Sequence, residues 1–294
     1  MKVSRKAIIS TLLFSILPLT NAKAAKIAPI EQAITLAQVN SESGQKHTYL
    51  VLNHRSDKVG AVNLSEHYNY YPDDALSFLN QFDYNQLQEI SDALKVQNLN
   101  INELLPAGGE RTQHVAAGAN YVEHSEEADI HEVFLFPKFA TPTPTQSQIR
   151  YSSEVLLDYE VELCMRWVEG LKADPSGYVG LFVCGDFTDR AELLRKIDVD
   201  NVTSGHGFSD AKSGATRFPT GPYIVVPKDW SSFVDQIDLE TVVNGITRQA
   251  ALASEMIVMP DELMERILYQ GGCQSGSTKI KPYHYSMPTL NRKA

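Results

Sequence analysis

The sequence predicts an α+β fold made mainly of strands, with a small N-terminal domain in front of a larger one. Residues 72–96 repeat apolar side chains at three- and four-residue spacing, which is typical of a helix. Residues 106–109 read PAGG, and this composition marks a connector. Beyond it, short apolar or alternating runs predict strands at 131–136, 155–167, 178–184 and 223–226. We therefore expect a small α+β domain at 25–110 and a strand-rich domain at 111–294.

The remaining elements are predicted from local signals. Residues 46–62 read as short strands that break at 53–56, where the sequence is NHRS. One helix is expected after Thr188. Another is expected at 261–269, because Pro260 suits the first turn of a helix.

The first 24 residues have the layout of a secretory signal peptide. A basic start precedes an apolar run at 7–19 and the sequence NAKA at 21–24, which offers small residues to a signal peptidase. The run is too short to span a bilayer. We expect cleavage after Ala24, a periplasmic or secreted protein, and no membrane anchor after cleavage. A buried N-terminal helix is the alternative.

The composition is that of a globular protein, with 43% hydrophobic and 21% charged residues. The formal net charge is −10, and residues 1–24 carry four basic side chains and no acidic one, so the mature chain stands near −14. Such a chain repels nucleic acid, and we expect no nucleic-acid partner. An anionic substrate would need a local cation to hold it.

The three cysteines are Cys164, Cys184 and Cys273. An odd number leaves at least one unpaired thiol. Cys164 and Cys184 lie in apolar strand-like runs, where small buried residues are common. The sequence therefore predicts no disulfide framework.

The clearest candidate for metal ligation is the alternating segment 157–163, which reads LDYEVEL. Strand side chains alternate between faces, so Asp158, Glu160 and Glu162 should share one face. Carboxylates two apart in a strand can converge on one cation, and oxygen ligands suit Mg²⁺, Mn²⁺ or Ca²⁺. The alternative is an edge strand with a solvated acidic face.

A third carboxylate follows the apolar strand 178–184. The sequence runs on as GDFTDR at 185–190, which places Asp186 next to a glycine at the expected end of that strand. This is a suitable position for a third metal ligand. The alternative is that Asp186 or Thr188 caps the following helix.

His124 and Glu127 are the candidates for proton transfer. They are three residues apart, so they are neighbours on a helical turn. A carboxylate beside an imidazole orients the ring and raises its basicity, which suits activation of water. The alternatives are a charged surface turn or a metal site that adds His131, although the spacing differs from that of zinc peptidases.

Six segments, in order along the chain, resemble the motifs of the fumarylacetoacetate hydrolase family. They are GANYVEHSEE at 118–127, FPK at 136–138, LDYEVEL at 157–163, DFTDR at 186–190, Lys212 with PTGP at 219–222, and VNGITRQ at 243–249. The resemblance implies a mixed β-sandwich roll, and it makes 111–294 the catalytic domain.

The resemblance also implies roles for individual residues. Glu160, Glu162 and Asp186 would hold the metal, with Lys212 beside the metal and the substrate. His124 and Glu127 would activate water on a lid. Substrate-binding positions would be Arg190, Lys138 and Tyr121. The implied cofactor is Mg²⁺ or Mn²⁺, with Ca²⁺ as a third candidate, and a homodimer is expected by analogy.

The implied activity is metal-dependent hydrolysis of a carbon–carbon bond in a small anionic 2-oxo acid or 1,3-diketone, such as an acylpyruvate or a fumarylacetoacetate-like compound. The sequence departs from the family pattern at Leu193, where a Gln is usual, at Ala191, where an acid is common, and at 270–273, where Thr-Gly-Thr-Pro becomes QGGC. These departures keep two alternatives open. One is an oxo-acid decarboxylase or isomerase, and the other is a non-catalytic exported binding protein that retains the metal site. A Cys or Ser hydrolase built on GCQSG at 272–276 lacks a readable orienting partner.

Overall fold

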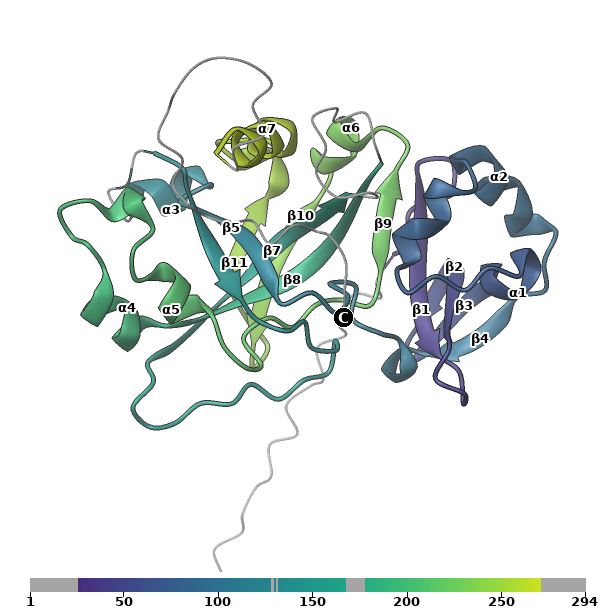
Figure 1. The fold of residues 1–294 in the computed structure, drawn as a ribbon, viewed down its shortest axis with the longest axis horizontal. Coiled ribbons are helices and arrows are strands. Elements are labelled where there is room, and N and C mark those ends of the chain that lie inside the picture. Colours follow the sequence, from purple (N-terminus) through teal and green to yellow (C-terminus); the bar gives the residue numbers. More distant parts are fainter. Residues whose placement is uncertain (1–25, 128–129, 131, 168–177, 271–294) are drawn as a thin grey trace, which may run out of the picture.

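The computed structural model describes residues 26–127, 130, 132–167 and 178–270. A seven-stranded sheet forms its centre (Figure 1), and the described strand pairs within it are antiparallel. Its order is β4 (Gln97–Asn100), β3 (Lys58–Asn63), β2 (Lys46–Arg55), β1 (Ala33–Asn40), β9 (Ile224–Pro227), β8 (Val179–Asp189) and β7 (Leu157–Trp167). The expectation of an α+β fold made mainly of strands is confirmed.

Two separate antiparallel hairpins flank the end of the sheet that β7 and β8 form. They are β5 (Gln113–Gly118) with β6 (Phe134–Phe139), and β10 (Asp238–Val243) with β11 (Ile246–Leu252). The turn between β10 and β11 is Asn244-Gly245, and both residues have positive φ, as a tight two-residue hairpin turn requires. An isolated parallel bridge from Thr143 to Pro219 is the one parallel pairing among the described residues.

The helices are short. The α-helices are α1 (Leu64–Tyr68), α2 (Tyr84–Glu89), α3 (Val122–Glu127), α4 (Arg190–Lys196), α5 (Phe208–Lys212), α6 (Trp230–Val234) and α7 (Pro260–Gln270). The 3-10 turns are η1 (Ala75–Asn80), η2 (Ile90–Asp92), η3 (Ile101–Glu103), η4 (Val202–Ser204) and η5 (Ala253–Glu255). Of these elements, η1 and α2 pack against the interior strand β1. Within the described residues, no helix is long and apolar enough to cross a membrane. The expected signal peptide lies outside them.

The sheet and the largest apolar cluster cross the expected domain boundary near residue 110. Strand β1 pairs with β9, and Ile34 and Leu50 belong to the same buried cluster as Phe182 and Ile224. Figure 1 shows the α1–α2 region beyond β1, on the side away from the two hairpins. The division at 25–110 and 111–294 stays a prediction.

Residues 72–96 were expected to form one helix. Most of the apolar positions are buried, but the helix is not continuous. The segment contains η1, α2 and η2 in place of one helix. Asp74 accepts a hydrogen bond from Leu76 N at 3.0 Å and Asp83 accepts one from Gln86 N at 2.9 Å. Each aspartate therefore starts a new helical piece, which divides a continuous helix.

Strand β8 is longer than expected. Asp186 lies inside it, and neither Asp186 nor Thr188 caps the next helix. Asp189 does so, because its carboxylate accepts a hydrogen bond from Glu192 N at 3.1 Å at the start of α4. The helix cap and the candidate metal ligand are thus different residues.

Cys184 is buried, as expected, but the prediction that Cys164 and Cys184 form no disulfide is wrong. They form a disulfide across β7 and β8, with their Cα atoms 5.9 Å apart. Cys164 lies opposite Phe182 and Cys184 lies opposite Glu162, so the two side chains share a face and meet diagonally. Pairing between the two strands, which a local sequence reading does not supply, brings the sulfurs together.

Candidate metal and active site

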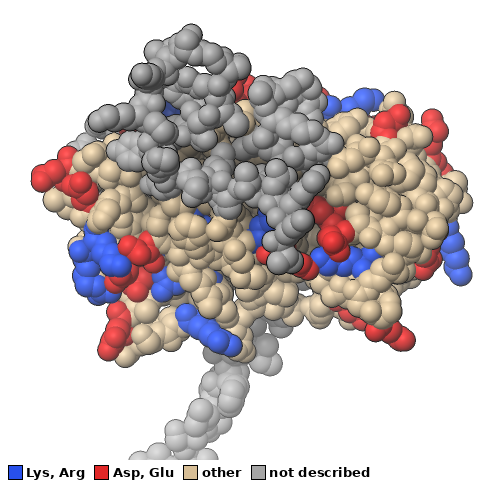
Figure 2. Space-filling view, viewed as in Figure 1, with Lys and Arg blue, Asp and Glu red and all other residues tan. Residues whose placement is uncertain are grey.

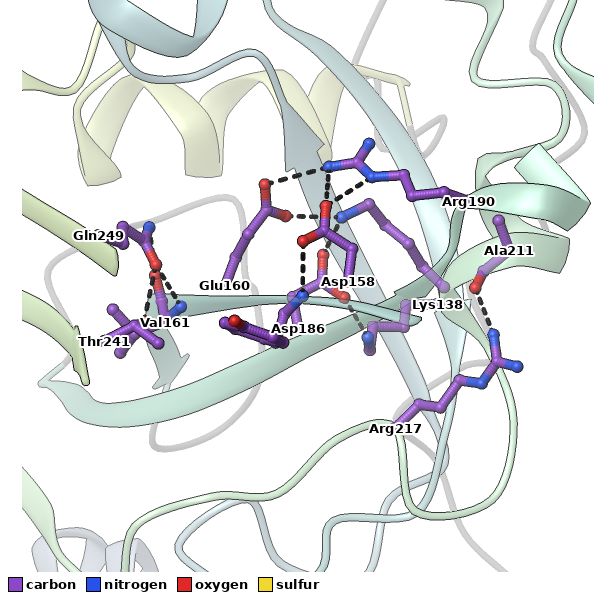
Figure 3. Close-up of polar contacts among 12 residues, drawn as sticks. Lys138, Asp158, Glu160, Val161, Asp186, Arg190, Ala211, Arg217, Thr241 and Gln249 are labelled. Atoms are coloured by element: carbon purple, nitrogen blue, oxygen red, sulfur yellow. Dashed lines mark hydrogen bonds and ion pairs between the residues drawn. The ribbon is translucent and has the colours of Figure 1, made fainter. Parts of the chain in front are cut away.

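The register of β7 and β8 gathers the acidic side chains. Glu160 lies directly opposite Asp186, and Asp158 lies opposite Thr188. Side chains of directly opposed residues point to the same face, and so do side chains two apart on one strand. Figure 3 shows Asp158, Glu160 and Asp186 turned toward a common region between the strands and Arg190. The alternation read from the sequence therefore leads to a three-dimensional acidic site that also includes Glu162.

Two buried lysines enter this region from different elements. Lys212, the last residue of α5, donates to Oε2 of Glu160 over 3.1 Å and to Oδ2 of Asp186. Lys138, from β6, donates to Oδ1 of Asp186 and lies 5.6 Å above the ring centroid of Phe218. The two ammonium groups supply the local positive charge that an acidic chain needs in order to hold an anion.

The pKa directions in this cluster follow from burial and from the ion pairs. Burial alone would raise the pKa of Asp186, but the charges of Lys212 and Lys138 hold it below its usual value. Burial alone would lower the pKa of Lys212, yet Asp186 and Glu160 raise it above its usual value. Burial does lower the pKa of Lys138, because this lysine bonds one carboxylate only and has the charge of Lys212 nearby.

Glu162 is a carboxylate of the cluster to which neither lysine donates a hydrogen bond. Burial, followed by the charges of Asp186 and Glu160, raises its pKa to about 8. Among the described side chains it has no hydrogen-bonding or ion-pair partner. The hydroxyl of Tyr121 is buried and also lacks a partner among the described residues, and burial and then the charge of Glu162 raise its pKa. Glu162 and Tyr121 therefore face a place where further polar or charged groups would be stabilised.

Arg190 closes one side of the acidic cluster. It is the first residue of α4, and its Nε donates to Oδ2 of Asp158 over 2.6 Å, while Nη2 lies 3.5 Å from Oε1 of Glu160. The resemblance implied a substrate-binding role for Arg190, and the structure shows it paired with neighbouring carboxylates. Asp158 was absent from the predicted set of site residues, although the same alternation placed it on this face.

The donor set fits a hard divalent cation. Among the described residues, no three His, Cys, Asp or Glu side chains are gathered as a ready ion cage, and the ammonium of Lys212 lies between Glu160 and Asp186. However, Glu160, Glu162 and Asp186 offer carboxylate oxygens only, which suit Mg²⁺, Mn²⁺ or Ca²⁺. Burial and the neighbouring carboxylates raise the pKa of Glu162, so a cation at this side of the cluster would favour its ionised form.

The proposed proton-transfer residues lie on α3. Its backbone carries His124 and Glu127 on one short helix, while their side chains and residue His131 lie outside what the structure describes. Asn120 anchors the chain just before α3, since its amide donates to Val258 O over 3.0 Å and accepts from Val258 N at 2.8 Å. Tyr121 follows it and bridges to Met256.

Leu193, which departs from the family pattern, is buried. It packs with Phe208 and Ala211 in an apolar cluster beneath α4 and α5. At the surface of these helices, Lys196 pairs with Glu192 at 2.9 Å and with Asp210 at 3.2 Å. Figure 2 shows such blue and red neighbours at the end of the molecule where α4 and α5 lie. The altered segment 271–273 lies outside the described residues.

Sequence comparisons match this arrangement to a known family. Residues 113–276 match the family model described as Fumarylacetoacetate (FAA) hydrolase C-terminal. An uncharacterized protein of Staphylococcus saprophyticus is 31% identical over 183 residues, which are 59% of this chain and 57% of that protein. One from Staphylococcus epidermidis is 31% identical over 179 residues, 56% of this chain and 55% of that protein. The chain thus spans little more than half the length of these curated relatives.

Solved structures of similar shape include two with functional descriptions. A probable 2-hydroxyhepta-2,4-diene-1,7-dioate isomerase from Mycobacterium abscessus has a TM-score of 0.49 and 21% identity, covering 80% of this chain and 79% of that chain. A fumarylpyruvate hydrolase from Pseudomonas aeruginosa, in complex with Mn²⁺ and pyruvate, has a TM-score of 0.40 and 21% identity, covering 54% of this chain and 71% of that chain.

Proposed function

This chain belongs to the fumarylacetoacetate hydrolase family, and we propose that it is a divalent-metal-dependent hydrolase that cleaves a carbon–carbon bond in a small anionic 2-oxo acid or 1,3-diketone. Mg²⁺ or Mn²⁺ is the proposed cofactor, held by Glu160, Glu162 and Asp186. Decarboxylation or isomerisation of an oxo acid is the alternative within the same family.

One observation carries the proposal. Glu162 lies in a cluster of carboxylates with a pKa raised to about 8, and no described side chain pairs with it. A structural ion-pair network would balance its charges, because an uncompensated buried carboxylate is unfavourable. A bound divalent cation would stabilise the ionised form of Glu162.

The residues around the cluster have distinct proposed tasks. A metal ion held by Glu160, Glu162 and Asp186 would supply Lewis acidity toward the oxygens of the substrate. Lys212 and Lys138 attract and orient the anionic substrate, and Arg190 holds Asp158 and Glu160 in place. Tyr121 offers a hydroxyl at the side of Glu162.

His124 is the proposed general base. It would take a proton from water that attacks the distal carbonyl carbon of the substrate, while Glu127 orients the imidazole. The hydroxide adds to the carbonyl carbon, and the adjacent carbon–carbon bond then breaks. The electron pair of that bond stays on the fragment that leaves as the enolate.

A second candidate function is metal-dependent capture of an oxo acid without turnover. Leu193 favours it, because its apolar side chain is buried in the cluster with Phe208 and Ala211, at a position where the family usually has a Gln. The acidic site alone would still bind a metal and an anion.

A substrate panel separates the two candidates. We would assay acylpyruvates, oxaloacetate and fumarylacetoacetate-like diketo acids with Mn²⁺, with Mg²⁺ and with chelator. Metal-dependent turnover of a diketo acid supports the hydrolase, and turnover of oxaloacetate alone supports the decarboxylase. Metal-dependent binding without turnover supports the capture protein, and binding that ignores metal would contradict all three.

Export and a homodimeric state also remain proposals. The Cys164–Cys184 disulfide supports export, because such bonds persist in oxidising compartments such as the periplasm. A mature N-terminus at Ala25 in protein from the native host is the expected result of N-terminal sequencing.

A further inference from the structure

Strand β7, which carries two of the proposed metal ligands, is the edge strand of the seven-stranded sheet. Its inner side pairs with β8 along its full length. An edge strand leaves every second backbone N–H and C=O without a partner in the sheet. The outer side of β7 therefore needs other groups to hold it at the place where Glu160 and Glu162 project.

Gln249 of β11 supplies these groups at the residue between the two ligands. Its Oε1 accepts a hydrogen bond from Val161 N at 2.7 Å, and its Nε2 donates to Val161 O over 3.2 Å. One side-chain amide thus bonds both backbone groups of Val161, as a neighbouring strand would. Figure 3 shows Gln249 beside Val161 and Thr241.

The amide of Gln249 is itself oriented from β10. Thr241 donates from Oγ1 to Oε1 of Gln249 over 2.9 Å, and the two residues are directly opposed in the hairpin. This bond identifies Oε1 as the acceptor and leaves Nε2 free to donate to Val161. The orientation of the amide is therefore determined by contacts on both sides.

The hairpin is irregular at this point. Thr241 lies opposite Gln249, but Val242 lies opposite Thr247, so Arg248 is an extra residue that forms a bulge. Bulges change the direction of side chains and are common beside active sites. The bulge lies next to Gln249, whose side chain points out of the hairpin and bonds β7.

We propose that Gln249, oriented by Thr241, is a positioning residue that holds β7 at Val161 so that Glu160 and Glu162 present their carboxylates to the metal ion. This inference rests on the proposed function. A small rotation of the β7 backbone at Val161 would move both carboxylates together. Groups that hold metal ligands from behind typically change metal affinity about 10- to 100-fold when they are removed.

The test uses Mn²⁺ alone as the probe and the full chain. Gln249→Met keeps the length of the side chain and removes all three hydrogen bonds. Thr247→Val is the matched control, because the Thr247 hydroxyl donates to Glu240 over 2.5 Å within the same hairpin and makes no described hydrogen bond to Val161 or Gln249. Electron paramagnetic resonance of free Mn²⁺ measures the dissociation constant of each variant.

We expect Gln249→Met to raise the dissociation constant for Mn²⁺ by about 10- to 100-fold, and Thr247→Val to leave it unchanged. Amide hydrogen exchange of Val161 in the metal-free protein should speed up in Gln249→Met only. If Gln249→Met binds Mn²⁺ like the parent, the positioning role is wrong, even where Val161 exchanges faster, because the amide then only covers a sheet edge.

If Gln249→Met does not fold, Thr241→Val is measured in its place. It keeps both bonds to Val161 and loses the one that orients the amide, so its dissociation constant for Mn²⁺ is expected to exceed that of Thr247→Val. Equal constants for the two threonine variants would overturn the inference. A parent protein that binds no Mn²⁺ at all would instead overturn the proposed metal site, which is a different result from a binding parent with unaffected variants.

Discussion

Glu160 of β7 and Asp186 of β8 lie directly opposite each other, and a single ammonium group bonds both. Lys212 donates to Glu160 over 3.1 Å and also to Asp186. The same two carboxylates are proposed metal ligands. Lysine and metal thus compete for the same oxygens. Removing the carboxylates should therefore weaken metal binding, and removing the lysine should strengthen it.

Removal of carboxylates should abolish the response to metal. Mg²⁺ or Mn²⁺ at about 100 times its dissociation constant should stabilise the parent by about 2.7 kcal/mol, because binding to the folded state alone shifts the unfolding equilibrium. The double variant Glu160→Gln, Glu162→Gln should show no rise in melting temperature. Glu192→Gln, at the surface of α4, is the control that should respond like the parent. An unchanged response in the double variant would mean that the metal binds elsewhere.

Removal of the competing lysine should have the opposite effect. Lys212→Met should bind Mn²⁺ up to about tenfold more tightly, equivalent to about 1.4 kcal/mol, because no ammonium neutralises Glu160 and Asp186. The metal-free variant should melt at a lower temperature, since the two carboxylates then repel each other. Lys196→Met removes a surface ammonium that bonds Glu192 and Asp210, so it should leave Mn²⁺ affinity unchanged. Weaker Mn²⁺ binding by Lys212→Met would show that the lysine supports the metal site.

Replacement of His124 should separate proton transfer from metal binding. His124→Ala should keep its Mn²⁺ affinity and lose about two to four orders of magnitude in kcat, the usual contribution of a general base. Glu127→Ala should lose less, because it only orients the imidazole, and Asp186→Ala should lose metal and activity together. Kinetics on whichever diketo acid is turned over provides the measurement. Full activity in His124→Ala would remove α3 from the mechanism.

The disulfide should contribute measurably to stability. Its two cysteines are 20 residues apart, and closing a loop of this size stabilises a protein by about 3 kcal/mol. A reductant should therefore lower the melting temperature of the parent. The variant Cys164→Ala, Cys184→Ala should melt low with or without reductant, while Cys273→Ser should behave like the parent. Equal melting of the parent in both conditions would argue against the bridge.

His114 should make the protein less stable in mild acid. Burial lowers its pKa below the ordinary value of 6.5, and its ring packs 4.5 Å from that of Phe218. Because the folded state binds this proton less readily than the unfolded state, stability falls as the pH drops below 6.5, by at most about 1.4 kcal/mol per pH unit. Urea unfolding at pH 7.5 and 5.5 should show a larger loss for the parent than for His114→Gln. Parallel losses would assign the acid sensitivity to other groups.

Much of the metal site could be predicted because its signal is local. The two-residue alternation around Glu160 and Glu162 is a property of any strand, and the resemblance of six ordered segments identified the family that the comparison of residues 113–276 then confirmed. The strands at 155–167 and 178–184 were expected for the same reason, and they differ from β7 and β8 only in where they begin and end. The turn sequence Asn244-Gly245 is an equally local hairpin signal that was read only as part of a family motif.

The sequence by itself determined the fold class, the family and the shared face of the acidic residues, since these follow from composition, order of motifs and strand periodicity. Only the tertiary structure decided which distant groups meet there. The pairing of Cys164 with Cys184, the two lysines on Asp186 and the bond from Gln249 to Val161 join residues 20 to 88 positions apart. Contacts of that separation depend on the register and packing of whole strands, which no local pattern in the chain encodes.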